Sequence, residues 1–461
     1  MISSDTAEEQ MELDGQADPG EWNGEQPDIH PSIAGAFRAL DRAGLPWVLL
    51  RGEDDLVRPD GDVDILLGDG HTQRLDSVLA GAGFRRVVAR GHGSHRFYFS
   101  YDAAEDLWLK LDIVSEISFG PYQQWHTPLA GGCLKRRIRN GLLWLPATTE
   151  QAWLQLLHIM LDKGGYVRPE RMETVRIAGA LASTDDVIAS FVDRQVGPGT
   201  AAQLLGLVRS GSFDEFRGPA LRMASALTRN APWRTRFTAG SNRVLRLLSP
   251  TFPGRFSRGV VVGVIGPRGP AKTSLMQAVG AGFPVPSRSV SFAVGKTGRW
   301  DRRLTRITGG RFSPDMFAQL VGALAATYHY RRGRLVLVDR RAYDTQLPGP
   351  PARIDRDRTE HRLAAALVPE PDILLVLDAP AETLFGTDTG HPPETLERYR
   401  QDQLEGAKRL GKTRIIDAAL PQPAIRRAAI EILWQHVAGS FPELAAPGPP
   451  APPTPEAGGQ P

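Results

Sequence analysis

The pattern of apolar and polar residues divides the chain into two α/β segments with a helical segment between them. Uninterrupted apolar runs at 260–265, 333–339 and 372–378 predict strands that are buried on both faces of a parallel sheet. Residues 62–67 and 107–114 instead alternate, which is typical of strands with one face in the core. The pattern therefore predicts an α/β protein with two domains joined by helices.

Changes in the pattern set the expected boundaries. We expect a disordered acidic arm at 1–28, a mixed-sheet α/β domain at 29–148, a helical extension or connector at 149–248, a parallel-sheet domain at 255–440, and a disordered Pro/Ala-rich tail at 441–461. Within 29–148 the expected helices are 32–43 and 71–82, and the expected strands are 47–50, 62–67, 84–89, 96–101 and 107–114.

A glycine-rich turn follows the run at 260–265 and precedes a helical pattern. Its sequence matches the phosphate loop Gly-x-x-x-x-Gly-Lys-[Ser/Thr], except that Ala271 replaces the last glycine. Such a loop points backbone amides at a polyphosphate, while Lys272 reaches the outer phosphates and the Thr273 hydroxyl binds Mg²⁺. The residues predicted to contact the nucleotide are Gly266, Arg268, Gly269, Pro270, Ala271, Lys272, Thr273 and Ser274.

The alanine at position 271 leaves an alternative open. If the last glycine position requires a left-handed backbone, Ala271 costs about 1–2 kcal/mol of strain. The loop could then be an ordinary strand–turn–helix connection in which Lys272 points into water. Only seven lysines occur in this arginine-rich chain, however, so a lysine at this position favours phosphate binding.

Two charged side chains end the second apolar run, and one ends the third. Asp339 and Arg340 follow one strand and Asp378 ends the other. Because the carboxyl ends of parallel strands meet at the ligand edge of such a sheet, we expect all three near the phosphate loop. Asp339 would hold a Mg²⁺-bound water or orient the acceptor, and Arg340 would grip the acceptor's phosphate or hydroxyl.

These stretches, together with residues 414–418, resemble the thymidylate-kinase-like branch of the phosphate-loop kinases over about 258–437. The resemblance implies ATP, Mg²⁺, a small acceptor and a basic lid. In the lid region Thr387 and Asp388 stand where basic residues are expected, so Arg398 and Arg400 remain to stabilise the transferred phosphoryl group. Arg268 also replaces the acid that contacts the acceptor sugar. These departures indicate an acceptor other than thymidylate, or a domain that binds a nucleotide without catalysis.

Three acidic side chains in the N-terminal segment form a second candidate site. Asp62 and Asp64 share one face of a strand, and Asp112 lies on the polar side of a later strand. If the two strands are neighbours, the three carboxylates converge and repel one another unless a cation lies between them. The sequence therefore predicts bound Mg²⁺ or Mn²⁺ with oxygen ligands.

A strand that ends at Gly52, the paired acids and the later single acid together resemble the nucleotidyltransferase superfamily with the polymerase-β type of palm, over about 31–165. The resemblance implies that Asp62 and Asp64 bind metal, that Asp112 binds metal or activates the attacking hydroxyl, and that Gly52 lies beside the triphosphate. The superfamily's usual Gly-Ser is Gly52-Glu53 here, which removes the serine contact to the triphosphate.

The helical segment carries one histidine and several arginines of interest. His158 lies in an apolar helix and is interpreted as a core residue rather than a metal ligand. The arginines could bind nucleic acid, but a solvated helix face is the favoured interpretation. They are Arg222, Arg229, Arg234, Arg236, Arg243 and Arg246.

Composition narrows the compartment and the ligand class. The single cysteine, Cys133, excludes an internal disulfide framework, and no long apolar run or secretory leader is apparent, so we expect a cytoplasmic protein without a membrane partner. The first 28 residues carry nine acids and no lysine or arginine, so the remainder has an excess of about twelve positive charges. This positive charge suits phosphate-rich ligands, but it is equally compatible with an arginine-rich surface that is only solvated.

The leading hypothesis is a kinase-like phosphotransferase fused to a metal-dependent nucleotidyltransferase-like domain. It would use a nucleoside triphosphate and a small-molecule acceptor. The alternatives are a nucleotide-binding regulator with a degenerate kinase domain, and a toxin-like transferase that modifies RNA ends. The oligomeric state is left open.

Overall fold

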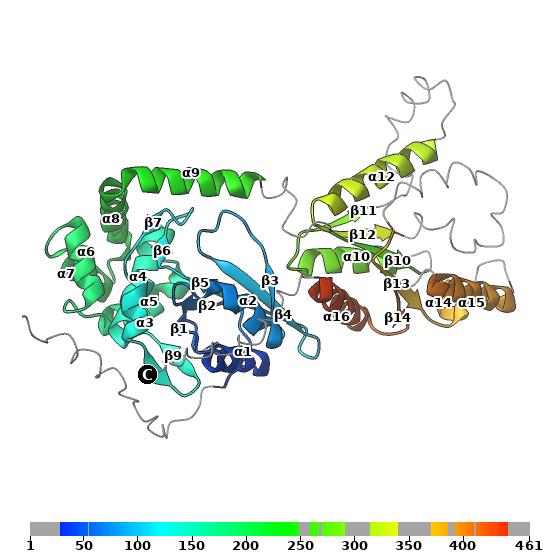
Figure 1. Ribbon diagram of the computed structural model, residues 1–461, viewed down its shortest axis with the longest axis horizontal. Helices are drawn as coiled ribbons and strands as arrows, with labels where there is room; N and C mark the ends of the chain where they lie inside the picture. The colour runs from blue at the N-terminus through cyan, green and yellow to red at the C-terminus, as the bar shows by residue number, and fades with distance from the viewer. Residues whose placement is uncertain are drawn as a thin grey trace, which may run out of the picture.

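The computed structural model describes residues 28–53, 55–248, 259–266, 270–290, 314–339, 370–385, 392–409 and 412–440. The acidic arm up to residue 27, the Pro/Ala tail and most of the lid region lie outside these ranges. The described parts form two α/β units, one built on each of two five-stranded sheets (Figure 1).

The N-terminal sheet is mixed, as the sequence predicts. Its strands are β1 (Trp47–Arg51), β2 (Asp62–Leu67), β3 (Arg85–Val87), β4 (Arg96–Asp102) and β5 (Leu107–Val114), in the order β1-β2-β5-β4-β3. Strands β2 and β5 are parallel and the other neighbours are antiparallel. Helices α1 (Pro31–Arg42) and α2 (Thr72–Gly81) add their apolar side chains to the core on one face. Phe37 stacks there on Trp47 with ring centroids 4.7 Å apart.

The second face of this sheet meets the helical segment. Val48, Leu66 and Val114 from three strands join one apolar cluster with residues of the helices that follow. The helices that contribute are α4 (Thr148–Asp162), α5 (Met172–Leu181), α6 (Val187–Val196), α7 (Thr200–Ser210) and α8 (Arg217–Asn230), and α9 (Pro232–Leu248) follows them in the chain without entering the cluster. Because the cluster is continuous, the helices from α4 to α8 pack as part of the N-terminal unit.

Short elements that the sequence did not predict connect β5 to α4. They are the hairpin strands β6 (Ser118–Phe119) and β7 (Trp125–His126), helix α3 (Ala130–Lys135), and the hairpin strands β8 (Ile138–Asn140) and β9 (Leu143–Leu145). Two 3₁₀ helices, Pro169–Arg171 and Phe213–Phe216, lie among the larger helices. Runs of two or three residues give too few positions for a period, so the pattern could not reveal these hairpins.

The C-terminal sheet is wholly parallel, which confirms the prediction from the apolar runs. It contains β10 (Val260–Ile265), β11 (Ser287–Val290), β12 (Leu335–Asp339), β13 (Ile373–Asp378) and β14 (Thr413–Asp417), in the order β11-β12-β10-β13-β14. Apolar clusters join one face to α10 (Pro270–Gly282) and α16 (Gln422–Ser440), and the other to α12 (Pro314–Arg331) and α15 (Pro393–Arg409). A short helix, α14 (Ala381–Phe385), follows β13.

The two units meet through aromatic side chains. Trp108 of β5 packs edge-on against Phe283 and Trp434, with ring centroids 5.5 and 5.0 Å away. Tyr101 of β4 lies beside Trp108 and donates a hydrogen bond of 2.7 Å to Asp106 in the β4–β5 turn. Asp106 also forms an ion pair with Arg426 of α16. The β4–β5 hairpin therefore links the N-terminal sheet to the C-terminal unit.

Within the described ranges, no helix is both long enough and apolar enough to cross a membrane.

Candidate functional sites

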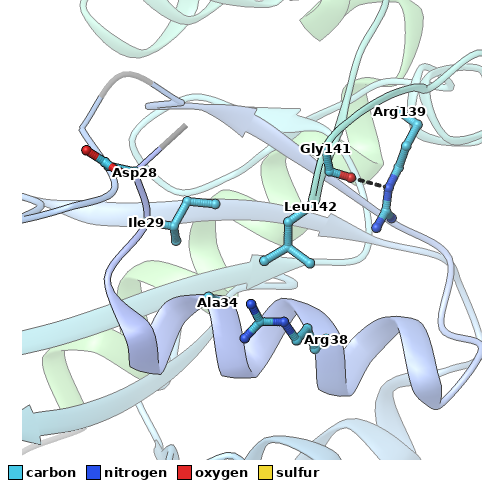
Figure 2. A pocket seen from close by; sticks show the side chains of 7 residues that line it. All are labelled: Asp28, Ile29, Ala34, Arg38, Arg139, Gly141 and Leu142. Atoms are coloured by element: carbon cyan, nitrogen blue, oxygen red, sulfur yellow. Dashed lines mark hydrogen bonds between the residues drawn. The ribbon is translucent and has the colours of Figure 1, made fainter. Parts of the chain in front are cut away.

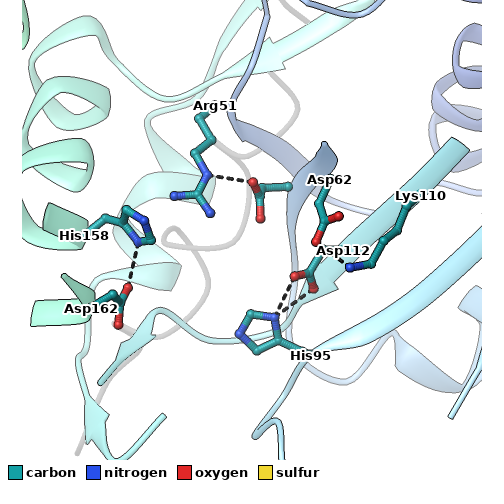
Figure 3. Close-up of polar contacts among 8 residues, drawn as sticks. Arg51, Asp62, His95, Lys110, Asp112, His158 and Asp162 are labelled. Atoms are coloured by element: carbon teal, nitrogen blue, oxygen red, sulfur yellow. Dashed lines mark hydrogen bonds and ion pairs between the residues drawn. The ribbon is translucent and has the colours of Figure 1, made fainter. Parts of the chain in front are cut away.

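The three predicted acids of the N-terminal unit lie on one face of the sheet. Asp64 stands directly opposite Asp112 in the parallel pair β2–β5, and Asp62 stands opposite Lys110. Strand β1 adds Arg51 opposite Asp64. Facing residues of neighbouring strands share a side of the sheet, so these five side chains form two adjoining rows (Figure 3).

Each of the three carboxylates already has a cationic partner. Lys110 Nζ lies 2.6 Å from Asp62, and Arg51 Nε lies 2.6 Å from Asp64. His95 Nδ1 lies 2.8 and 2.9 Å from the two oxygens of Asp112. Because basic side chains of the protein lie beside all three acids, their repulsion alone does not require a metal ion, and metal binding by Asp62, Asp64 and Asp112 stays a prediction. Among the described residues, no three His, Cys, Asp or Glu side chains are arranged to hold a metal ion.

Two of these pairs raise the pKa of the basic partner. Burial alone would lower the pKa of Arg51, but the hydrogen bond and the charge of Asp64 outweigh burial and raise it. Burial likewise opposes protonation of His95, yet the hydrogen bond and the charge of Asp112 raise the pKa of this imidazole above its ordinary value. The carboxylate face therefore places basic groups beside each acid rather than carrying a block of negative charge.

Helix α4 lies across from this face and contributes a second His–Asp pair (Figure 3). His158 Nδ1 lies 2.7 Å from Asp162 Oδ2, four residues later. Asp162 Oδ1 accepts a hydrogen bond of 2.6 Å from the Gly120 amide. His158 has a hydrogen-bond partner, as expected of a satisfied residue, but its side chain is partly exposed rather than buried in the core. The sequence did contain the signal, since residues four apart share a helix face.

Gly52 and Glu53, which stand where the resemblance expects Gly-Ser, each have a structural role in the turn after β1. Gly52 has φ +87°, a backbone conformation that favours glycine, and it follows directly after Arg51. The Glu53 carboxylate accepts a hydrogen bond of 2.5 Å from Gln151 of α4. Glu53 therefore ties the turn to the helical segment.

The predicted phosphate loop of the C-terminal unit connects β10 to α10. Lys272 is 8% exposed, and its Nζ donates a hydrogen bond of 2.9 Å to the Gly266 carbonyl. The alternative in which Lys272 simply points into water is therefore wrong. Thr273 and Ser274 are exposed in the first turn of α10.

The other loop residues divide into two groups. Pro270 and Ala271 are the first residues of α10, where the backbone is right-handed, so the left-handed strain considered for Ala271 does not arise. Arg268 and Gly269 lie outside the described residues.

Two predicted acidic residues end strands beside the phosphate loop. Asp339 ends β12 and pairs in register with Val264 of β10, and Asp378 ends β13 on the other side of β10. The chain passes from β10 to β11 and β12 on one side, then to β13 and β14 on the other, so the loop lies where the strand order reverses. Arg340, Thr387 and Asp388 lie outside the described residues.

The two arginines proposed for phosphoryl transfer differ in environment. Arg400 of α15 lies 2.8 and 2.9 Å from the two oxygens of Asp378 and also pairs with Glu397. The hydrogen bonds that Arg400 donates to Glu397 and Asp378 raise the pKa of its guanidinium. Arg398 is exposed on the same helix. Arg400 is thus held at the end of β13, whereas Arg398 projects from the surface.

A shallow cavity of about 350 Å³ lies away from these sites, between α1 and the β8–β9 turn (Figure 2). Its lining residues are Asp28, Ile29, Ala34, Arg38, Arg139, Gly141 and Leu142. Arg139 is already paired with Asp41 at 2.8 Å. The lining includes none of the predicted site residues.

No protein-family model and no curated protein matches the chain. Solved structures with some likeness include thymidylate kinase from Candida albicans, at 14% identity and a TM-score of 0.28, covering 39% of this chain and 93% of that one. A gluconokinase from Sinorhizobium meliloti 1021 has 20% identity and a TM-score of 0.23, covering 39% of this chain and 94% of that one. Likeness at this level does not establish a shared fold or function.

Proposed function

We propose that the C-terminal unit is an ATP- and Mg²⁺-dependent phosphotransferase that acts on a small phosphorylated or hydroxylated acceptor. The observation that carries this proposal is the position of Lys272, which lies in the first turn of the helix that follows the buried strand β10 and directs its ammonium group back onto the Gly266 carbonyl. A lysine and the amides of a helix N-terminus then face the same space, and both attract phosphate.

The residues around this space fit a nucleotide with its metal ion. Lys272 would bind the outer phosphates, and the exposed hydroxyls of Thr273 and Ser274 are hard oxygen donors of the kind that Mg²⁺ takes. Asp339 ends the neighbouring strand, where it would hold a water of the ion or orient the acceptor. The ion, when bound, neutralises charge on the phosphates. The chain itself positions the two substrates and stabilises charge, and it forms no covalent bond to either.

Beyond the loop, Arg400 supports this proposal through its place at the end of β13. Its pairing with Asp378 fixes a guanidinium at the carboxyl edge of the sheet, where it would stabilise the transferred group. Arg398 would reach the acceptor from solvent, and Arg340 would grip the acceptor's phosphate or hydroxyl.

A second function is favoured by the in-register acids of the N-terminal sheet. We propose that Asp62, Asp64 and Asp112 form a metal-dependent nucleotidyltransferase site. Their carboxylates are the donors that Mg²⁺ and Mn²⁺ prefer, and they lie on adjoining strands. Among the described residues these acids are not arranged to hold an ion, since Arg51 and Lys110 pair with two of them, and both are the kind of side chain that would bind the triphosphate instead.

Within that site the other residues have distinct roles. Asp112 would accept the proton of the attacking hydroxyl, because His95 holds this carboxylate in a fixed orientation. Gly52 would bring the backbone close to the triphosphate, as its positive φ allows.

Nucleotide binding tests the main proposal. The affinity of the full chain for an ATP analogue with Mg²⁺ is measured by calorimetry for the wild type, Lys272→Ala and the control Lys408→Ala. Lys408 is exposed in the last turn of α15, so its removal should change nothing. Loss of a buried ammonium that contacts phosphate should weaken binding at least about tenfold. Equal affinity of Lys272→Ala and the wild type would show that the loop does not bind phosphate.

Turnover separates the remaining alternatives. The wild type is incubated with labelled ATP, Mg²⁺ and a metabolite extract, and we expect a labelled product that requires Lys272. Tight ATP binding without any product would indicate a nucleotide-binding regulator. RNA binding that falls steeply as salt rises would instead support the RNA-end transferase, because phosphate contacts release counterions.

A further inference from the structure

Helix α9 buries polar side chains and exposes large apolar ones, which is the reverse of the usual arrangement. Thr235 and Asn242 face the protein and are 7% and 8% exposed. Trp233, Phe237 and Leu247 face outward and are 82%, 77% and 74% exposed. A surface helix of a globular protein normally buries its apolar stripe and exposes its polar one. The reversed arrangement therefore needs an explanation other than packing against this chain.

Polar contacts hold α9 in place. Asn242 Nδ2 donates to the Tyr122 carbonyl at 2.8 Å, and Arg246 donates to the carbonyls of Gly91 at 2.8 Å and Pro121 at 2.6 Å. Across the described residues, the buried apolar clusters include no side chain from α9. The helix is therefore anchored by hydrogen bonds, and its apolar side chains do not contribute to the core.

The outward face of α9 is an apolar stripe bordered by positive charge. Trp233, Phe237, Val244 and Leu247 follow at helical spacing, so they lie along one side of α9. The exposed arginines Arg236 and Arg243 lie along one border of the stripe, and Arg234 lies on the other. The helix from Pro232 to Leu248 contains no Asp or Glu.

We propose that this face of α9 binds an anionic lipid surface, with the helix lying in the plane of the membrane interface. Aromatic and aliphatic side chains then enter the boundary between headgroups and acyl chains, while the bordering arginines extend to the lipid phosphates. Such a contact is peripheral, so it needs no membrane-spanning helix. The prediction of no membrane partner rests on the lack of a spanning segment, whereas a peripheral contact depends on the apolar stripe beside these arginines.

Other occupants fit this face less well. A second copy of the chain would bring the arginines of two α9 helices together, and α9 offers no carboxylate to pair with them. Single-stranded RNA could stack on Trp233 and Phe237, but Val244 and Leu247 offer it neither stacking nor hydrogen bonds. Lipid is the occupant that uses the arginines, the aromatic residues and the aliphatic residues together.

Vesicle co-sedimentation of the full chain tests the proposal. The vesicles contain either equimolar phosphatidylglycerol and phosphatidylcholine or phosphatidylcholine alone. We expect binding to the anionic vesicles only, and the double variant Trp233→Ser/Phe237→Ser should bind at least about tenfold more weakly. The control Ile177→Ser/Leu181→Ser removes two apolar side chains of α5 that are 52% and 49% exposed, and it should bind like the wild type.

Charge and folding are tested separately. The triple variant Arg234→Gln/Arg236→Gln/Arg243→Gln should weaken binding by about fivefold for each arginine. Circular dichroism should show that every variant is folded, because the changed side chains are exposed. Failure of the wild type to bind anionic vesicles would overturn the proposal, as would equal binding by Trp233→Ser/Phe237→Ser. Loss of self-association or of RNA binding in that variant, without vesicle binding by the wild type, would assign the face to those partners instead.

Discussion

The two candidate sites of this chain are built from different parts of the polypeptide. The N-terminal site consists of side chains on a mixed sheet, where Asp62, Asp64 and Asp112 face Lys110, Arg51 and His95. The C-terminal site depends on the main chain, because a strand, a turn and a helix N-terminus create it and Lys272 is its central side chain.

This difference decides how each site tolerates sequence change. In the side-chain site, Glu53 stands where the resemblance expects a serine, yet the acids keep their places because the strand register sets them. In the main-chain site, a substitution matters when it changes the backbone. Ala271 does not, since it lies within the right-handed first turn of α10. The effect of a substitution in a motif therefore depends on whether the motif uses the side chain or the backbone at that position.

The largest expected effect separates the two sites. Lys272→Ala should lower phosphotransfer at least about a hundredfold and leave nucleotidyl transfer unchanged. Asp62→Asn/Asp64→Asn should do the opposite by a similar factor, because the two changes remove the proposed metal ligands. Both rates are measured with labelled ATP and Mg²⁺. Loss of both activities in either variant would mean that the chain has one shared site rather than two.

Removal of the aromatic contact between the units should have a smaller effect. Trp108→Ala deletes the ring that packs on Phe283 and Trp434, and Trp108 is only partly buried. We expect the free energy of unfolding to fall by about 2 kcal/mol and the two units to unfold in separate transitions. Urea denaturation followed by circular dichroism measures both.

The matched control for this variant is Trp233→Ala on the exposed face of α9. Its free energy of unfolding should stay within about 0.5 kcal/mol of the wild type. A single unchanged transition for Trp108→Ala would contradict the view that the β4–β5 hairpin connects the units energetically.

The protein cations of the side-chain site should compete with a metal ion. Lys110 lies 2.6 Å from Asp62 and 4.6 Å from the ring centroid of Phe97. Lys110→Met keeps the packing against the ring and removes the charge, so Mg²⁺ affinity should rise about tenfold. Calorimetric titration with Mg²⁺ measures it, and the exposed Lys135→Met is the control. Unchanged affinity in Lys110→Met would argue against a metal ion beside Asp62.

The smallest expected effect concerns the departure in the phosphate loop. Ala271→Gly restores the motif but places a poor helix former in the first turn of α10, so stability should fall by about 0.5 kcal/mol. Nucleotide affinity should stay within about twofold, because the backbone there is already right-handed. Thermal unfolding and calorimetry test the two halves of this prediction. Much tighter nucleotide binding would show that the bound loop needs a left-handed residue.

The sequence predicted the arrangement of elements better than the partners within the sites. Alternation correctly placed Asp62 and Asp64 on one face of a strand. The pairing of Asp64 with Asp112 depends on β2 and β5 being parallel neighbours, and alternation within one strand carries no information on that. Lys110 could have been assigned to the site from the sequence, because it lies two residues before Asp112 in the same strand and thus on the same face. His95 lies just before β4, outside any helix or strand, so no periodic pattern predicts which way its side chain points.

Helix α9 shows a second limit of periodicity. The spacing of Trp233, Phe237, Val244 and Leu247 identifies a stripe, but it does not say whether the stripe faces the core or the solvent. The stripe faces solvent because Asn242 and Arg246, on the other side of the helix, form hydrogen bonds with the rest of the protein. Gly91 and Tyr122, which accept hydrogen bonds there through their carbonyl oxygens, are distant in sequence from α9.

One face of strand β5 contacts three different parts of the molecule within eight residues. Val114 lies in the core shared with the helices, Asp112 and Lys110 lie in the carboxylate site, and Trp108 lies against the C-terminal unit. All four project from one side of the strand, so a shift of β5 by a single residue would exchange them for Leu107, Leu109, Leu111 and Ile113. One inserted or deleted residue in the β4–β5 turn would therefore remove a core contact, a reactive site and a domain contact in a single step.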